Sequence, residues 1–227
     1  MSNATQSLAG TRITSLLDAN SFVEIGQSVT ARNTDFNMTE KKAPSDGVIT
    51  GYGVIDGSLV YVYSQDASVL NGTIGEMHAK KIANIYDMAM KMGAPVIGLI
   101  DCAGLRLQEA TDALNAFGSF YYKQAMASGV IPQITAVFGN CGGGLAAAAA
   151  LSDFTFMAEN GKLFVNSPNT IPGNTADKCD TASAKFQSEE SGIVDGVGSE
   201  EEILGEIRSL VAILPANNED NDAYDEC

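Results

Sequence analysis

The stretch Asp101-Cys-Ala-Gly-Leu-Arg-Leu-Gln-Glu109 follows directly on an apolar run at residues 95–100, and it decides the fold. A second apolar run at 131–138 leads in the same way into Gly139-Asn-Cys-Gly-Gly-Gly-Leu145 and a run of alanines. We call residues 101–109 the first loop and residues 139–145 the second loop. Each leads from a predicted strand into a predicted helix, where free backbone amides can hold an anion. Two such strand ends side by side would form a cup that stabilises an enolate.

Predicted strands and helices alternate around these loops. Strands are predicted over 95–100, 132–138 and 153–158, with helices over about 109–128 and 143–151 between them. This alternation predicts parallel pairing with right-handed crossovers in an α/β fold. Both loops then fall at the C-terminal ends of strands, where open α/β sheets bind ligands.

Two further elements have strong local signals. The β-rich runs 48–55 and 59–63 are joined at Asp56-Gly57, which predicts a hairpin. A long helix is predicted from Glu76 to Met92, and Gly93 is a suitable residue to end it.

The C-terminal part of the chain is predicted to end in a capped helix. Ser199 and Glu202 have the spacing of a capping box, and Pro215 ends the apolar helical pattern that follows. The domain is therefore expected to span residues 1–216, with an acidic, disordered tail over 217–227. The remaining predictions are a helix over 11–17, an exposed loop over 31–46, a strand over 162–165, a long loop over 166–182 and a helix near 183–190.

Composition excludes several classes of function. The 227 residues carry a net charge of −15, which argues against nucleic-acid binding. No apolar run reaches the roughly 20 residues of a membrane span, and no signal peptide is apparent, so we expect a cytoplasmic protein. The cysteines at 102, 141, 179 and 227 lack CxxC spacing, so no metal site is expected.

The order Asp-x-x-Gly-x-Arg-x-Gln-Glu, followed by Gly-x-Cys-x-Gly-Gly, resembles the N-terminal half of biotin-dependent acyl-CoA carboxyltransferases. The resemblance extends over about residues 10–217. It includes segments 12–24, 46–57, 64–66 with 72–76, 128–133 and 152–157. It implies a crotonase-like (ClpP/crotonase) α/β fold, built as a spiral of ββα units in a single domain.

The resemblance implies a site made of backbone donors. Ala103 and Gly104 would offer amides to one oxyanion from the first loop, and Gly143 and Gly144 would do so from the second. Small residues let an acyl group approach the backbone closely. The other interpretation of the first loop is a plain strand-to-helix turn. The small residues of the second loop also suit a helix packed tightly on a sheet.

Coenzyme A is polyanionic, so its phosphates need a local basic patch in this acidic chain. Lys41, Lys42 and Arg106, together with Gly72, are the expected coenzyme A contacts. Arg106 and Glu109 have two further interpretations, as residues that orient the first loop or as a surface ion pair.

No general base or nucleophile stands out. His78 is the only histidine, and it is expected on a surface or helix face. Cys102 and Cys141 lie in the loops but lack a partner base, so structural roles are expected. In the family, the biotin ureido nitrogen takes the α-proton, and the protein supplies positioning and oxyanion holes.

The chain departs from the family pattern in three places. Cys102-Ala-Gly-Leu-Arg106 replaces Ser-Gly-Gly-Ala-Arg, which makes Leu105 bulkier than the usual alanine. The segments 178–182 and 186–192 also differ. The chain covers only the N-terminal half of the family, so we expect a split enzyme in which a homologous C-half subunit binds the carboxybiotin.

The expected function is that of the acyl-CoA-binding subunit of a biotin-dependent carboxyltransferase, working in the carboxylation or the decarboxylation direction. Expected partners in a hetero-oligomer are the C-half subunit, a biotin carboxyl carrier protein, and a biotin carboxylase or membrane decarboxylase subunit. The alternatives are a biotin-free malonyl-thioester decarboxylase subunit, a crotonase-type hydratase or isomerase with Glu109 as its carboxylate, and a scaffold whose pocket Leu105 blocks.

Overall fold

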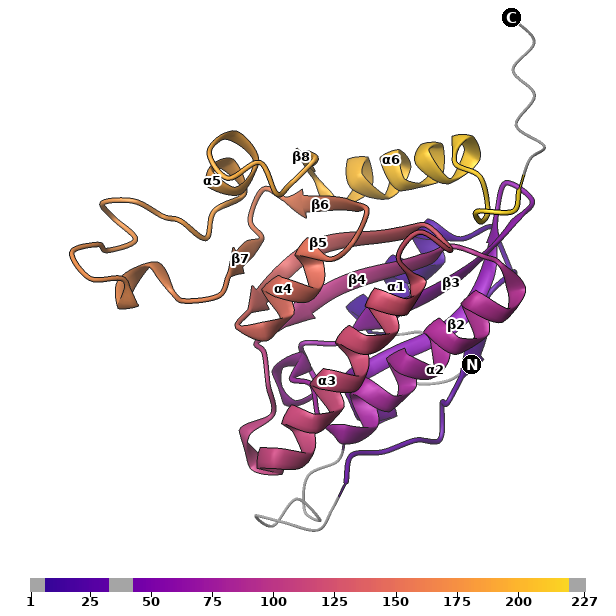
Figure 1. Ribbon diagram of the computed structural model, residues 1–227, viewed down its shortest axis with the longest axis horizontal. Coiled ribbons are helices and arrows are strands. Elements are labelled where there is room, and N and C mark those ends of the chain that lie inside the picture. The colour runs from indigo at the N-terminus through magenta and orange to yellow at the C-terminus, as the bar shows by residue number, and fades with distance from the viewer. Residues whose placement is uncertain (1–6, 33–42, 221–227) are drawn as a thin grey trace, which may run out of the picture.

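The computed structural model describes residues 7–32 and 43–220, and within them the strands form one 8-stranded sheet (Figure 1). The strands are β1 (Val23–Ile25), β2 (Val48–Ile55), β3 (Ser58–Gln65), β4 (Val96–Cys102), β5 (Gln133–Gly142), β6 (Phe154–Ala158), β7 (Lys162–Phe164) and β8 (Gly196–Gly198). Their order is β1-β2-β3-β4-β5-β6-β8, with β7 paired to the end of β5. β3, β4, β5 and β6 are parallel, and the parallel pairing of β4, β5 and β6 confirms the prediction.

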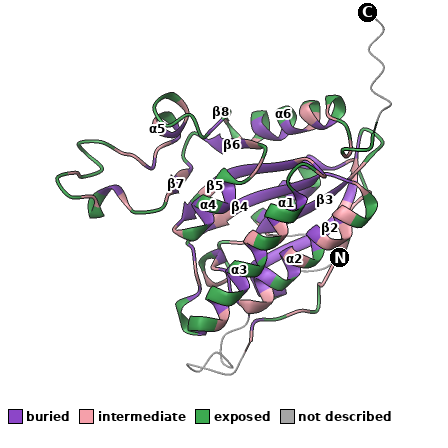
Figure 2. Ribbon diagram, viewed as in Figure 1, coloured by how far each residue is buried: buried purple, intermediate pink, exposed green. Residues whose placement is uncertain are grey.

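Helices cover both faces of the sheet. They are α1 (Leu8–Leu16), α2 (Glu76–Met92), α3 (Ala110–Ala127), α4 (Gly144–Ala150), α5 (Ala184–Glu189) and α6 (Glu200–Ile213). Short 3₁₀ turns lie at Ser45–Gly47, Leu70–Gly72, Leu107–Glu109 and Pro168–Thr170. One apolar core lies between the sheet and α2, α3 and α4, and a second lies between the sheet and α1 and α6 (Figure 2). None of the described helices is long and apolar enough to cross a membrane.

Local signals set the element ends as predicted. The hairpin between β2 and β3 turns at Asp56 and Gly57, both with positive φ. α2 ends at Gly93 in the left-handed conformation. Ser199 and Glu202 form the capping box of α6. All three predictions are confirmed.

Two predictions about irregular segments need correction. The loop predicted as exposed over 31–46 is buried at Ala31 and over most of 43–46, because Ala31 and Ala43 pack against Val69 and Leu70. The part of that loop at 33–42 lies outside the described residues. The tail predicted as disordered from 217 is docked at its start, because the Asn217 amide donates to Gly93 O at 2.9 Å. Residues 221–227 are outside the described part, so the expectation for them is untested.

Candidate active site at two strand ends

The two loops lie side by side at the C-terminal ends of β4 and β5, as predicted. Cys102 and Cys141 are paired in the parallel ladder. Beyond them the backbones almost touch, since a Cβ on Gly104 would lie 3.2 Å from the carbonyl oxygen of Gly142. Small residues at these positions therefore let two backbone segments meet, so the two loops lie next to each other as the sequence predicts.

The predicted amide donors are not equally available. Ala103 N–H donates to Asn71 O at 3.1 Å, and Gly143 N–H donates to Phe164 O at 2.9 Å. Two distant segments, residues 71–74 and β7, run alongside the loops and supply these carbonyls. The prediction of free amides at Ala103 and Gly143 is therefore wrong in this conformation.

Gly104 and Gly144 are the better placed donors. The Gly104 amide faces only the sulfur of Cys102, at 3.3 Å, and sulfur is a weak acceptor. Gly144 is the first residue of α4, where an amide has no carbonyl one turn earlier in the helix. Their role as oxyanion donors stays a prediction.

Gly72 packs beneath the first loop. Its φ is +62°, and a Cβ there would lie 2.3 Å from Asp101 O, so only glycine allows this crossing. The observed role of Gly72 is thus to let residues 71–74 approach β4, and its contact with coenzyme A stays a prediction. Lys41 and Lys42, the other predicted contacts, lie outside the described residues.

Arg106 lies inside the protein, with 1% of its surface exposed. Its guanidinium contacts Asp46, and it reaches Glu109 at 2.9 Å and Thr73 O at 2.6 Å. The surface ion pair considered from the sequence is therefore wrong. The same burial argues against a direct contact between Arg106 and a coenzyme A phosphate, because all of these partners hold the guanidinium inward.

Sequence reasoning missed Asp46 as a site residue. It is fully buried, and burial raises the pKa of Asp46 although the Arg106 guanidinium lowers it in part. The Asp46-Gly47 dipeptide signalled only a turn. The available clue was Arg106 itself, because an arginine predicted beside a strand end needs a carboxylate if it is buried.

His78 is buried on a face of α2, so of the two expected positions the helix face is confirmed and the surface is wrong. Its Nδ1 lies 2.9 Å from Asp46 O and its Nε2 lies 3.1 Å from Gln65 Nε2. Burial, with the nearby Arg106 charge, lowers the pKa of His78 to about 3. The imidazole is therefore neutral, and both ring nitrogens are occupied by hydrogen bonds.

The two loop cysteines are poor nucleophiles. Both are fully buried. Burial raises the pKa of Cys102 to about 12 and raises the pKa of Cys141 as well. A thiol that stays protonated at neutral pH does not attack a thioester.

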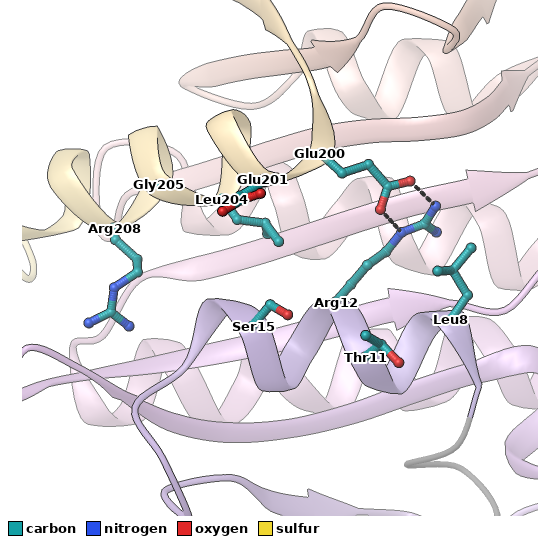
Figure 3. Close-up of a pocket in the computed structure, with 9 residues that line it drawn as sticks. All are labelled: Leu8, Thr11, Arg12, Ser15, Glu200, Glu201, Leu204, Gly205 and Arg208. Carbon is teal, nitrogen blue, oxygen red and sulfur yellow. Dashed lines mark hydrogen bonds and ion pairs between the residues drawn. The ribbon is translucent and has the colours of Figure 1, made fainter.

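Across the sheet, Arg12 in α1 connects several elements. It binds Glu200 in a bidentate pair at 2.7 and 3.0 Å, lines a cavity of about 640 Å³ between α1 and α6 (Figure 3), and reaches Asp101 at 3.3 Å. Asp101 in turn accepts from the backbone amide of Asn140 at 3.4 Å, so one carboxylate joins the starts of the two loops.

Within residues 7–32 and 43–220, no group of three or more His, Cys, Asp and Glu side chains could hold a metal ion.

The carboxyl transferase domain family matches residues 3–226. The chain is 42% identical to the methylmalonyl-CoA decarboxylase subunit alpha of Veillonella parvula, and 43% identical to the propionyl-CoA carboxylase beta chain of Roseobacter denitrificans. Each alignment covers 91% of this chain and 42% of the relative, so the chain spans less than half the length of these proteins.

Among solved structures, the transcarboxylase 12S hexamer with methylmalonyl-coenzyme A bound superposes with a TM-score of 0.92 at 31% identity. The superposition covers 96% of this chain and 44% of that one. This likeness confirms the crotonase-like α/β fold predicted from the sequence. With the family match over nearly the whole chain, it shows that the protein belongs to the carboxyl transferase domain family.

Proposed function

We propose that this chain supplies the acyl-CoA-binding half of a biotin-dependent acyl-CoA carboxyltransferase. The observation that carries the proposal is the meeting of the two loops at Cys102 and Cys141, in a chain of the carboxyl transferase domain family. The relatives include a decarboxylase subunit and a carboxylase chain, so the proposal covers both directions of carboxyl transfer.

In this proposal the chain contributes positioning and electrostatics. The amides of Gly104 and Gly144 would donate to the thioester oxygen as it gains negative charge, and the glycines admit the acyl group. Backbone donors fixed before the reaction need no reorganisation in the transition state, which makes them effective stabilisers of an enolate. Biotin on a separate carrier protein would supply the carboxyl group and take the α-proton, or, in the reverse direction, accept the carboxyl group and return a proton to the α-carbon. That division of roles fits a site whose imidazole and thiols are buried and neutral.

Glu109 argues against the hydratase alternative. A hydratase needs a carboxylate directed at the acyl group, whereas Glu109 accepts from the Glu76 amide at 2.6 Å and binds Arg106 at 2.9 Å. Both of its oxygens are therefore occupied by donors of the protein, the Glu76 backbone and the Arg106 guanidinium.

Binding of propionyl-CoA and methylmalonyl-CoA to the purified chain, measured by calorimetry, tests the proposal. We expect Gly104→Ala to weaken binding by about tenfold, since φ is +115° at that position and the added Cβ would lie 3.2 Å from Gly142 O, where the glycines are proposed to admit the acyl group. Gly129→Ala is the matched control: φ there is +73°, its Cβ meets open space, and it lies at the opposite end of α3. Hydration of crotonyl-CoA by the chain alone would contradict the proposal.

The proposed partners are a homologous C-half, a biotin carboxyl carrier protein, and either a biotin carboxylase or a membrane decarboxylase subunit. Native mass spectrometry of the complex isolated from its source, with a streptavidin blot of its subunits, tests them. We expect this chain to be recovered with a C-half and a biotinylated protein. A complex without biotin would favour the malonyl-thioester decarboxylase alternative.

A further inference from the structure

A buried ion network connects the first loop to residues near the start of α2. We call Asp46, Arg106 and Glu109 the Arg106 network. One guanidinium nitrogen of Arg106 contacts both carboxylates, and Asp46 and Arg106 are 0% and 1% exposed. A single buried charge without partners is strongly unfavourable, so each member depends on the others for its charge to be tolerated.

Each carboxylate also holds the start of α2. Asp46 accepts from the His78 amide at 2.7 Å, and Glu109 accepts from the Glu76 amide at 2.6 Å. Both amides lie in the first turn of α2, where helix amides have no partner within the helix. The Arg106 network therefore joins the N-terminus of a long, packed helix to the first loop.

The backbone of the first loop is tied to the same region. Ile74 N–H donates to Gly104 O at 2.9 Å, and Arg106 N–H donates back to Ile74 O at 2.9 Å. The next residue, Gly75, packs against the ion pair so closely that a Cβ would lie 2.4 Å from an Arg106 nitrogen and 2.5 Å from a Glu109 oxygen. A shift of the Arg106 guanidinium would therefore move the backbone at residues 74–75, and Gly104 would move with it because its carbonyl is bound to Ile74.

We propose that Asp46 and Glu109 are positioning residues for the first loop, which fix the direction of the Gly104 amide through Arg106 without contacting the substrate. The consequence for catalysis rests on the proposed function; the consequence for the loop does not. A donor displaced by about 1 Å loses about 100-fold in rate, so a network that touches no reacting atom can still set the turnover number.

Hydrogen exchange of the amides at 103–106, followed by mass spectrometry, tests the structural step. We expect Asp46→Asn and Glu109→Gln to raise exchange at these amides about tenfold or more, with exchange in β5 and α6 unchanged. Asp56→Asn is the matched control. Asp46 and Asp56 both have a φ of +49°, and Asp56 shares Arg208 with a second aspartate, Asp18. Asp56 precedes β3, so it lies at the end of the parallel strands opposite to the first loop. The Asp56→Asn variant should therefore leave hydrogen exchange at the amides of 103–106 unchanged.

Two results would overturn the proposal: loop exchange equal to wild type in both variants, or exchange raised evenly over the whole chain. Glu109→Gln keeps the Asp46–Arg106 pair, so it retains a folded test protein if Asp46→Asn does not fold. Arg106→Lys should behave like the carboxylate variants, because an ammonium cannot contact Asp46, Glu109 and Thr73 in one plane.

Kinetics of the reconstituted complex with propionyl-CoA test the catalytic step. For Glu109→Gln we expect kcat to fall about 100-fold while KM stays within about threefold, the pattern of a lost transition-state interaction. A rise in KM alone would contradict it. If the wild-type complex shows no carboxyl transfer, the proposed function fails, and the exchange result still decides whether the Arg106 network positions the loop.

Discussion

His78 illustrates how burial decides the charge of one residue. Asp46 O can only accept a hydrogen bond, so Nδ1 of His78 carries the proton and Nε2 accepts from the Gln65 amide. A second proton would remove that acceptor and place a positive charge near Arg106. Burial of the imidazole, which disfavours the charged form, is the main cause of the pKa of about 3, and the nearby charge of Arg106 lowers it further.

The pH dependence of stability follows from this pKa. Between pH 6.5 and about 3, the unfolded chain protonates His78 and the folded chain does not, so the free energy of unfolding should fall as pH decreases through this range. The raised pKa of Asp46 has the opposite sign, since the folded carboxyl takes up a proton first. The free energy of unfolding, measured by urea denaturation at a series of pH values, should change less steeply with pH in His78→Asn. The slope against pH should be lower by about 1.4 kcal/mol per pH unit in this range. An identical slope in both proteins would contradict the assignment.

Ala110 is strained where the first loop enters α3. Its φ is 44° and its ψ is −118°, a conformation that suits glycine and not alanine. We expect Ala110→Gly to raise the free energy of unfolding by about 1 kcal/mol, measured by urea denaturation. Ala125→Gly, at an exposed position inside α3, should lower it by about 1 kcal/mol. A loss of stability in both variants would show that Ala110 is relaxed.

At the scale of elements, α6 combines a local signal with an apolar stripe. Its buried residues, Ile203, Leu204, Ile207 and Val211, pack on the same face of the sheet as α1. The Ser199 hydroxyl and the Glu202 carboxylate satisfy amides at its start. The helix is therefore fixed at one end by its own residues and along its length by the sheet.

Removal of the cap should destabilise the protein measurably. Ser199→Ala is expected to lower the free energy of unfolding by about 1 kcal/mol, because the Glu202 amide loses its acceptor. Ser209→Ala, later in the same helix, removes only a bond from the hydroxyl to the Gly205 carbonyl and should have little effect. If the free energy of unfolding changed equally little in the two variants, the capping box would contribute nothing to stability in solution.

At the scale of the whole molecule, Arg12 connects α1, α6 and the end of β4. It is 4% exposed, it binds Glu200 and Asp101, and it lies 4.8 Å above the Phe138 ring. Arg12 thus joins α1 directly to α6, and it also links α1 to the strand that carries the first loop.

Arg12→Met should lower the free energy of unfolding by about 3 kcal/mol, because Asp101 is left partly buried without its cation. Glu200 is partly exposed, so water can solvate its charge when Arg12 is removed. The loss of stability should therefore be smaller than for a fully buried ion pair. Lys185→Met removes an exposed pair with Glu189 at 3.9 Å and should change stability by less than about 0.5 kcal/mol. A similar small change for Arg12→Met would show that α1 and α6 are held by apolar packing alone.

Elements with local signals were predictable from the amino-acid sequence. Helix α2 ends at Gly93, the hairpin turns at Asp56-Gly57, and the capping box starts α6, all as predicted, because neighbouring residues settle those conformations. The parallel order of β4 to β6 followed from the alternation of strands and helices, and it placed the two loops together.

Tertiary structure alone decided which groups in the site are free. The amides of Ala103 and Gly143 are occupied by carbonyls of Asn71 and Phe164, and Arg106 is held by Asp46 from 60 residues earlier in the sequence. No local pattern marks such partners, because hydrogen bonds and ion pairs form between whatever groups the packed elements bring within about 3 Å. The alternation of strands and helices therefore indicated which strand ends carry the two loops, and long-range packing determined which of their amides are free.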